Sequence, residues 1–144
     1  LNTNYHNPTM VVLKPGYALL VLANTLRIIP RLDEVKVWQY DNQTVKLARA
    51  TKDADRAQAA TLAGMYADAT LSERTPCAWK SIPRFLVAAD RAAREWNRTR
   101  KETIDPELRH RVAMSPLEKI TANEKHFVEK GCGSPGAYFE PYLR

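Results

Sequence analysis

Basic side chains gather in one part of this sequence at a spacing that suits the binding of anions. Residues 74–101 hold eight basic and two acidic residues, which accounts for the whole net charge of +6 of the 144-residue chain. On a helix over residues 84–101, five of the basic side chains fall within an arc of about 100°. One charge sign favours a polyanionic partner over the alternative, a solvated outer face of a bundle helix. The predicted anion-binding residues are Arg84, Arg91, Arg94, Arg98 and Lys101.

Anionic membrane lipid and an acidic glycoprotein are the two partners that fit this helix face best. Nucleic acid is not favoured, because few aromatic residues alternate with the basic ones and no recognised binding motif is present. Binding to lipid also needs apolar or aromatic side chains that enter the headgroup region. The predicted membrane-interface residues are the C-terminal aromatic residues Tyr138, Phe139 and Tyr142. Trp96 joins them only if the bundle opens, because it lies on the side of the helix opposite the basic residues.

The sequence holds no set of residues typical of an enzyme. It lacks a phosphate-binding glycine loop, an HExxH motif and a GxSxG motif. His6, His110 and His126 lie far apart along the chain, and we interpret them as surface residues. Acidic residues have basic neighbours at helical spacing, as Asp53 has Arg56, and such pairs solvate a helix face. We expect no catalytic residue, metal site or cofactor; carboxylates that meet only in the folded chain are the remaining alternative.

Cys77 and Cys132 are the only cysteines, and their spacing fits no zinc or redox motif. In a secreted chain an even number of cysteines favours a disulfide, and closing a 55-residue separation would stabilise the fold by about 4 kcal/mol. Two separate thiols are the alternative in a cytosolic chain. The chain starts with Leu1, as a secreted protein does after removal of its signal peptide, and a shortened chain would look the same. We therefore expect a secreted protein with this disulfide.

Helical periodicity dominates the chain and predicts an all-α fold, a bundle of about five helices. The apolar residues 17–29 predict a central buried helix, which Pro30 ends. Residues 32–50 predict a second helix. A third begins with the acidic residues near 51–55 and ends before the break at residues 72–76. The fourth covers residues 84–101.

Proline and cap residues predict the later elements. Asp105-Pro106 indicates a short helical turn, and Ser115-Pro116-Leu117-Glu118 is a capping box that begins a last helix. This helix ends at Gly131. Residues 131–144 hold three glycines and two prolines and are interpreted as an irregular tail, while residues 1–14 are interpreted as an extended arm. The prediction is a single helical domain over residues 1–144.

Six short segments, spread over most of the chain, resemble those of one known family. They are Tyr5-His6-Asn7-Pro8, Ile28-Ile29, Val35-Lys36-Val37-Trp38, Arg74-Thr75-Pro76, Ile104-Asp105-Pro106 and Leu117-Glu118-Lys119-Ile120. The family is that of the abalone sperm acrosomal proteins, which comprises the egg-coat-dissolving lysin and its fusagenic paralogue. Its members are small, basic, secreted proteins of five helices without enzymatic machinery.

The resemblance implies a role in fertilization and storage in the acrosomal vesicle. Lysin is more basic and richer in aromatic residues than this chain, and the two cysteines have no counterpart in the family, which favours the paralogue. The first hypothesis is then a non-enzymatic protein that binds and perturbs anionic membranes through an amphipathic helix and promotes membrane fusion between gametes. The alternative is a secreted protein that binds an acidic egg-coat glycoprotein, as lysin does.

Overall fold

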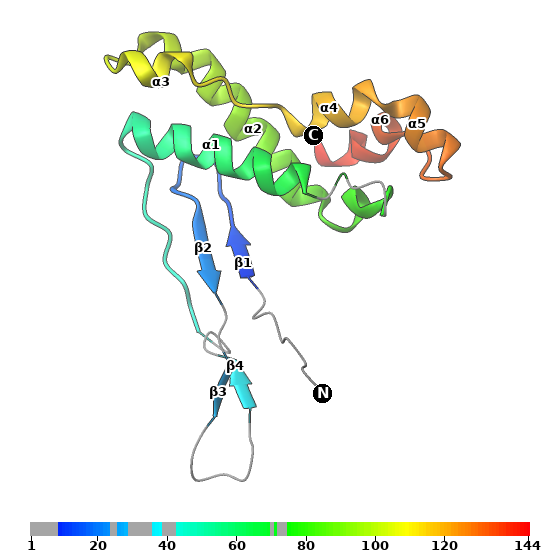
Figure 1. Cartoon of the computed structure of the whole chain (residues 1–144), viewed down its shortest axis with the longest axis horizontal. Helices are drawn as coiled ribbons and strands as arrows, with labels where there is room; N and C mark the ends of the chain where they lie inside the picture. Colours follow the sequence, from blue (N-terminus) through cyan, green and yellow to red (C-terminus); the bar gives the residue numbers. More distant parts are fainter. Residues whose placement is uncertain (1–8, 24–25, 29–35, 39–42, 70, 72–74) are drawn as a thin grey trace.

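The structure of the chain, a computed structural model, describes residues 9–23, 26–28, 36–38, 43–69, 71 and 75–144. Within these residues helices dominate, and short antiparallel strands extend from one side of the helical body (Figure 1). The described α-helices are α1 (Asp53–Asp68), α2 (Pro83–Thr99), α3 (Pro106–His110), α4 (Pro116–Ala122), α5 (Glu124–Glu129) and α6 (Pro135–Phe139). Three short 3-10 helices join them: η1 (Ala78–Ser81), η2 (Arg100–Glu102) and η3 (Glu140–Tyr142).

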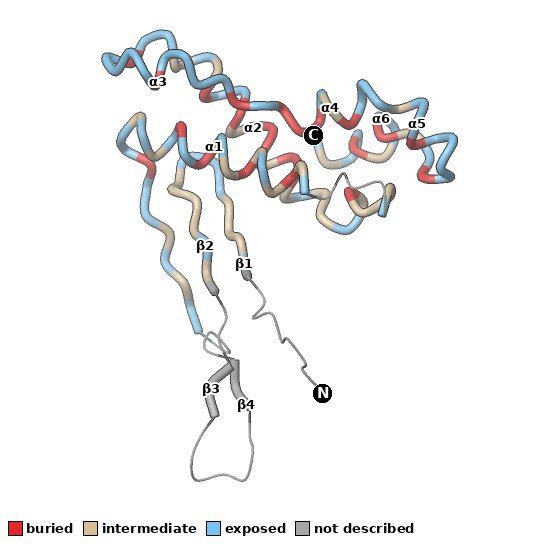
Figure 2. Tube along the Cα trace, in the orientation of Figure 1, coloured by how far each residue is buried: buried red, intermediate tan, exposed pale blue. Residues whose placement is uncertain are grey.

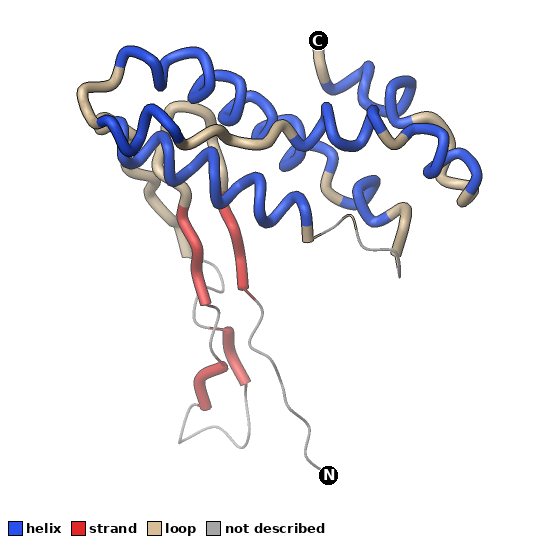
Figure 3. Tube along the Cα trace, turned by 45° about the horizontal axis from the view of Figure 1, so that its top comes forward, coloured by secondary structure: helices blue, strands red, loops and turns tan. Residues whose placement is uncertain are grey.

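The mainly helical character is confirmed, but the predicted helices over residues 17–29 and 32–50 are wrong in their described parts. β1 (Thr9–Val12) pairs antiparallel with β2 (Leu20–Ala23), and β3 (Leu26–Ile28) pairs antiparallel with β4 (Lys36–Trp38). Figure 3 shows these strands leaving the same side of the helical body. The fold is therefore not a pure helical bundle. Of the predicted arm, residues 9–12 form β1, while residues 1–8 lie outside the described residues.

A tight turn between two apolar runs explains the strands. Pro15 and Gly16 occupy the centre of a turn closed by the bond from Tyr17 N–H to the Lys14 carbonyl (3.0 Å), and Gly16 has a φ of 80°. Pro followed by a residue of positive φ is the pattern of a type II turn. Residues 43–50, which we call the returning segment, run alongside the residues that follow the turn. Ala18 N–H donates a hydrogen bond to the Ala48 carbonyl at 2.9 Å. A short apolar run bounded by turns suits a strand as well as a buried helix, and here the turn decides for the strand.

α1 and α2 pack against each other through small side chains. The third predicted helix is confirmed as α1, and its buried residues are all alanines: Ala57, Ala59, Ala60, Ala63 and Ala67. Ala89 and Ala93 are buried on α2. With so little side-chain volume between them, the two backbones can approach closely, as helix packing at small residues allows.

The main core surrounds Trp79, which lies in η1 and is fully buried. Its ring packs against Phe127 of α5 and against Tyr138 and Phe139 of α6, with centroid separations of 5.2–5.7 Å. The disulfide between Cys77 and Cys132 closes the same core, as the sequence predicts. Figure 2 shows buried residues concentrated in α1, α2 and the C-terminal helices, whereas the described parts of the strands are intermediate or exposed.

Residues 131–144 are not an irregular tail. Ser134 accepts a hydrogen bond from Ala137 N–H (3.3 Å) and caps α6, whose first residue is Pro135. The predicted last helix to Gly131 is also divided, because α4 ends at Ala122 and α5 begins at Glu124. The C-terminal residues therefore form ordered helices that complete the core around Trp79.

Candidate anion-binding site

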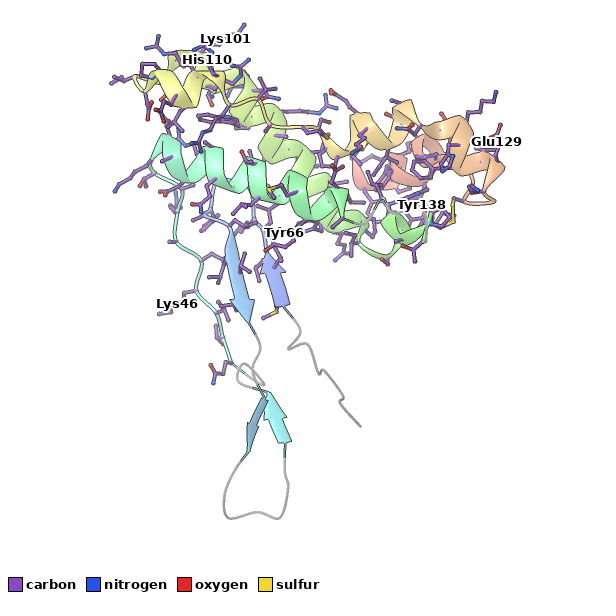
Figure 4. The ribbon with its side chains drawn as sticks, in the orientation of Figure 1. Lys46, Tyr66, Lys101, His110, Glu129 and Tyr138 are labelled. Atoms are coloured by element: carbon purple, nitrogen blue, oxygen red, sulfur yellow. A yellow bond between two sulfur atoms is a disulfide. The ribbon has the colours of Figure 1, made fainter. Side chains whose placement is uncertain are left out.

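The fourth predicted helix is confirmed as α2, and it carries its basic side chains on the exposed side. Its buried face consists of Leu86, Val87, Ala89, Asp90, Ala93 and Trp96. Four of the predicted anion-binding residues are exposed on α2, and Lys101 follows in η2. In Figure 4, Lys101 lies beside His110 at the α3 end of the molecule. The predicted face is therefore long, and its members differ in their surroundings.

Two of these basic residues are engaged within the protein. Arg94 donates from Nε to Asp90 (2.7 Å) and from a terminal nitrogen to Glu118 of α4 (3.3 Å). The hydrogen bond with Asp90, together with its charge, raises the pKa of Arg94. Arg98 forms an ion pair with Glu95 at 2.8 Å, although both side chains are largely exposed. Arg94 and Arg98 therefore contribute less positive potential than their number suggests.

The Asp90 carboxylate explains the position of Arg94. Asp90 is only 4% exposed, and it accepts a hydrogen bond from the Ser115 hydroxyl as well as from Arg94. Ser115 in turn accepts from Glu118 N–H at 3.2 Å and caps α4. A buried carboxylate has to be paired and hydrogen-bonded. This network therefore joins α2 to α4 and has a structural role.

A pocket of about 530 Å³ lies where the turn at residues 14–17 meets α1 and α2, and we call it the basic pocket. Trp96, Ala59 and Ala92 form an apolar part of its wall. The charged side chains that line it are Lys14, Arg49, Arg56, Arg91 and Glu95. Cations outnumber anions in this set, so the basic pocket attracts an anion.

Tyr17 organises two of the cations of the basic pocket. The Lys14 ammonium lies 4.5 Å from the centre of the Tyr17 ring, and the Arg49 guanidinium carbon lies 5.9 Å from it. Both distances are those of a cation–π contact. An isolated bridge pairs Tyr17 with Arg49 on the returning segment. The strand pairing therefore brings Arg49 next to Lys14 and Tyr17, although Arg49 lies far from both in the sequence.

Arg56 anchors the returning segment instead of pointing an unpaired charge into the basic pocket. Its Nε donates to the Ala50 carbonyl at 3.2 Å, and a terminal nitrogen contacts Asp53 at 3.3 Å. This ion pair is the one predicted from the helical spacing. Arg56 thus fixes the end of the extended segment against the start of α1.

A second pocket of about 360 Å³ adjoins the first through shared residues. Arg91 and Pro15 line both pockets, and Arg84 and Tyr142 line the second one. In the described part of the chain, neither Arg84 nor Arg91 forms an ion pair. The fold therefore places Arg84 and Arg91 beside the turn, and Arg91 also lines a third pocket of about 380 Å³ together with Arg94.

The predicted membrane-interface residues belong mainly to the core. Trp96 is 1% exposed, and its indole N–H donates to the Arg111 carbonyl at 2.6 Å. Phe139 is 2% exposed and packs on Trp79. Tyr138 is half-buried and donates its hydroxyl to the Lys80 carbonyl at 2.8 Å (Figure 4). Tyr142 is also half-buried. Trp96 and Phe139 are buried in the folded protein, so they would meet a membrane only if the helical body opened.

No group of histidine, cysteine and carboxylate side chains that could hold a metal ion occurs among the described residues. His110 and His126, two of the three histidines, are exposed. His6 lies outside the described residues. No described helix is both long and apolar enough to cross a membrane.

Sequence reasoning missed Lys14, Tyr17, Arg49 and Arg56, which include three of the four cations that line the basic pocket. The Lys14-Pro15-Gly16 pattern marks a turn, but the helix predicted over residues 17–29 separated it from α2. Arg49 belongs to the helix predicted over residues 32–50. The pairing of Tyr17 with Arg49 is a long-range contact, and no local pattern encodes it.

Known proteins give no independent indication of what the basic pocket binds. The resemblance to the abalone sperm proteins rests on its short segments alone, and a functional assignment rests on the pocket and its charges. No family model, curated protein or solved structure matches this chain.

Proposed function

We propose that the protein is a secreted, non-enzymatic binding protein for an acidic glycoprotein. The observation that carries this proposal is the position of Arg91. It lines both the basic pocket and the second pocket, and it has no ion-pair partner among the described residues. Charges that a fold does not neutralise internally remain available to an external anion. The resemblance to sperm acrosomal proteins would make this partner an acidic glycoprotein of the egg coat.

Burial of the aromatic residues favours a glycoprotein over lipid. A protein that enters the lipid headgroup region needs exposed apolar surface beside its charges. Trp96 and Phe139 are buried, so they would reach lipid only if the core opened. An acidic polymer needs only the exposed cations that the folded protein already presents.

Promotion of gamete membrane fusion at anionic lipid is a second candidate, which a different observation favours. Ile104 is 91% exposed and Val112 is 65% exposed, in the segments on either side of α3. Lys101 lies at the same end of the molecule (Figure 4). Exposed apolar side chains beside a cation suit a membrane interface.

Affinity for an immobilised sulfated polysaccharide, with elution by salt, tests the first proposal. The double variant Arg84→Glu/Arg91→Glu should bind about tenfold more weakly, because two exposed charge contacts of about 0.7 kcal/mol each give that factor. The control Lys125→Glu/Lys130→Glu changes the net charge equally, in α5 and directly after it, and neither residue lines the two pockets. This control should stay close to the unchanged protein.

Equal losses in the two double variants would contradict a defined binding surface, because net charge alone would then govern retention. The same proteins are also mixed with vesicles of neutral and of anionic lipid. Leakage from anionic vesicles that is lost in Ile104→Ser, without affinity for the polysaccharide, would favour the second candidate.

A further inference from the structure

We propose that the basic pocket holds a single acidic sugar unit, one that carries a sulfate or a carboxylate group. This inference rests on the proposed function and specifies which part of a glycoprotein the protein recognises. Such a unit combines an anionic group, hydroxyl groups and apolar C–H surface. The basic pocket offers a counterpart to each of these three features.

The size and depth of the pocket suit a ligand larger than an inorganic ion. Its volume of about 530 Å³ lies within the range of about 300–1,000 Å³ of small-molecule sites. Its lining includes the buried Trp96, whose indole N–H donates to the Arg111 carbonyl. A side chain that is already fixed lowers the cost of ordering the site when a ligand binds.

Three cations without an ion-pair partner among the described residues line the pocket. Lys14 and Arg49 both contact the Tyr17 ring, and Arg91 comes from α2. A sulfate or carboxylate group in the pocket would accept charge-assisted hydrogen bonds from these side chains.

The remaining lining residues match the uncharged parts of a sugar. Glu95 and Thr51 line the pocket with acceptor oxygens, and a carboxylate keeps acceptor capacity beyond its bond with Arg98. Sugar hydroxyl groups are donors for such oxygens. Leu13 and Ala92 offer apolar surface for the C–H groups. An inorganic anion would leave both of these features unused.

Calorimetric titration with a soluble sulfated disaccharide tests this inference, with the unsulfated disaccharide and inorganic sulfate as comparison probes. We expect saturable binding of the sulfated disaccharide, little binding of the unsulfated one and weaker binding of inorganic sulfate. Lys14→Gln and Arg49→Gln should each weaken the sulfated disaccharide about tenfold. Lys46→Gln is the matched control, because Lys46 is exposed on the returning segment away from the helical body (Figure 4). It should leave the affinity unchanged.

Three results would overturn the inference. Absence of saturable disaccharide binding, in a protein that still binds the polysaccharide through Arg84 and Arg91, would reject the sugar pocket and leave the proposed function standing. Equal affinity for inorganic sulfate and the disaccharide would reduce the site to a simple anion site. Binding of anionic vesicles that Lys14→Gln abolishes, with no binding of the disaccharide, would assign the pocket to a lipid headgroup.

Discussion

Removing the disulfide is the perturbation whose effect follows most directly from the structure. Cys77 and Cys132 are 55 residues apart, and the loop between them holds η1 and the helices α2 to α5. In the chain-entropy model, opening a loop of this length lowers the free energy of unfolding by about 4 kcal/mol. With an unfolding entropy of about 2.1 cal/mol/K per residue, the melting temperature would fall by about 10–15 °C.

Two forms of the protein distinguish the stabilisation that comes from closing the loop from the stabilisation that comes from packing of the Cys132 side chain. The reduced protein keeps both sulfur atoms, so it loses only the cross-link. The variant Cys77→Ala/Cys132→Ala also loses the side chain of Cys132, which is 1% exposed within the core, and should be about 1 kcal/mol less stable again. Urea unfolding of the oxidised, reduced and double-alanine proteins gives the three free energies.

A small effect would refute this reasoning. If the reduced protein and the double-alanine variant both lost less than about 1 kcal/mol, the loop would not restrict the unfolded chain as the entropy model requires. Alkylation of the denatured protein without reductant is the necessary first control. It should modify no cysteine, since both take part in the disulfide.

Two further predictions concern single side chains. Ser115→Ala should lower the free energy of unfolding by about 1–3 kcal/mol, because it removes both the donor to buried Asp90 and the cap of α4, whereas Ser81→Ala at an exposed site should change it by less than about 0.5 kcal/mol. Equal losses of unfolding free energy in Ser115→Ala and Ser81→Ala, measured by urea unfolding, would contradict a stabilising role of the Asp90 network. Burial, and then the neighbouring Tyr142, raise the pKa of Tyr138. Its protonated form therefore stabilises the fold below pH about 10, and this contribution is lost as the pH rises through the raised pKa. An alkaline absorbance titration should show a late phenol that Tyr138→Phe removes; an unchanged titration would contradict this.

Local sequence patterns identify the helices of the C-terminal half well. Asp105-Pro106 and Ser115-Pro116 each place a cap residue before a proline at the first helical position, and both begin helices in the structure. Ser134-Pro135 has the same pattern and begins α6, but the surrounding glycines led to the prediction of an irregular tail. At this position a cap residue followed by proline indicates a helix more reliably than a high glycine content indicates an irregular tail.

The N-terminal half could not be predicted in the same way, because its structure depends on pairing between distant residues. Residues 17–29 are apolar on nearly every side, and such a run fits a buried helix or a strand. The register that pairs Val11 with Val21 depends on the turn at Pro15 and Gly16. Strand pairing is selected by these tertiary contacts more than by intrinsic propensity.

The structure confirms the exposed position of the predicted basic residues of α2, whereas their partners within the protein could not be predicted. The periodicity of α2 placed Arg84 and Arg91 correctly on the exposed side, but it could not show that Arg94 is bound to Asp90 and Glu118. Those partners depend on the packing of α2 against α4. The same periodicity places Trp96 on the opposite side, where it is buried, but aromatic character alone does not reveal that Phe139 lies in the core.

The cations of α2 differ in their surroundings, and this difference supports the proposed anion site. Toward α4, Arg94 is matched by carboxylates and contributes to the fold. Toward the turn, Arg91 shares a pocket with Lys14 and Arg49, and none of the three forms an ion pair among the described residues, although Glu95 lines the same pocket. Such an excess of like charge destabilises the folded state. Natural sequences keep such local conflicts mainly where function requires them. The conflict at the basic pocket is therefore better explained by a bound anion than by any contribution to stability.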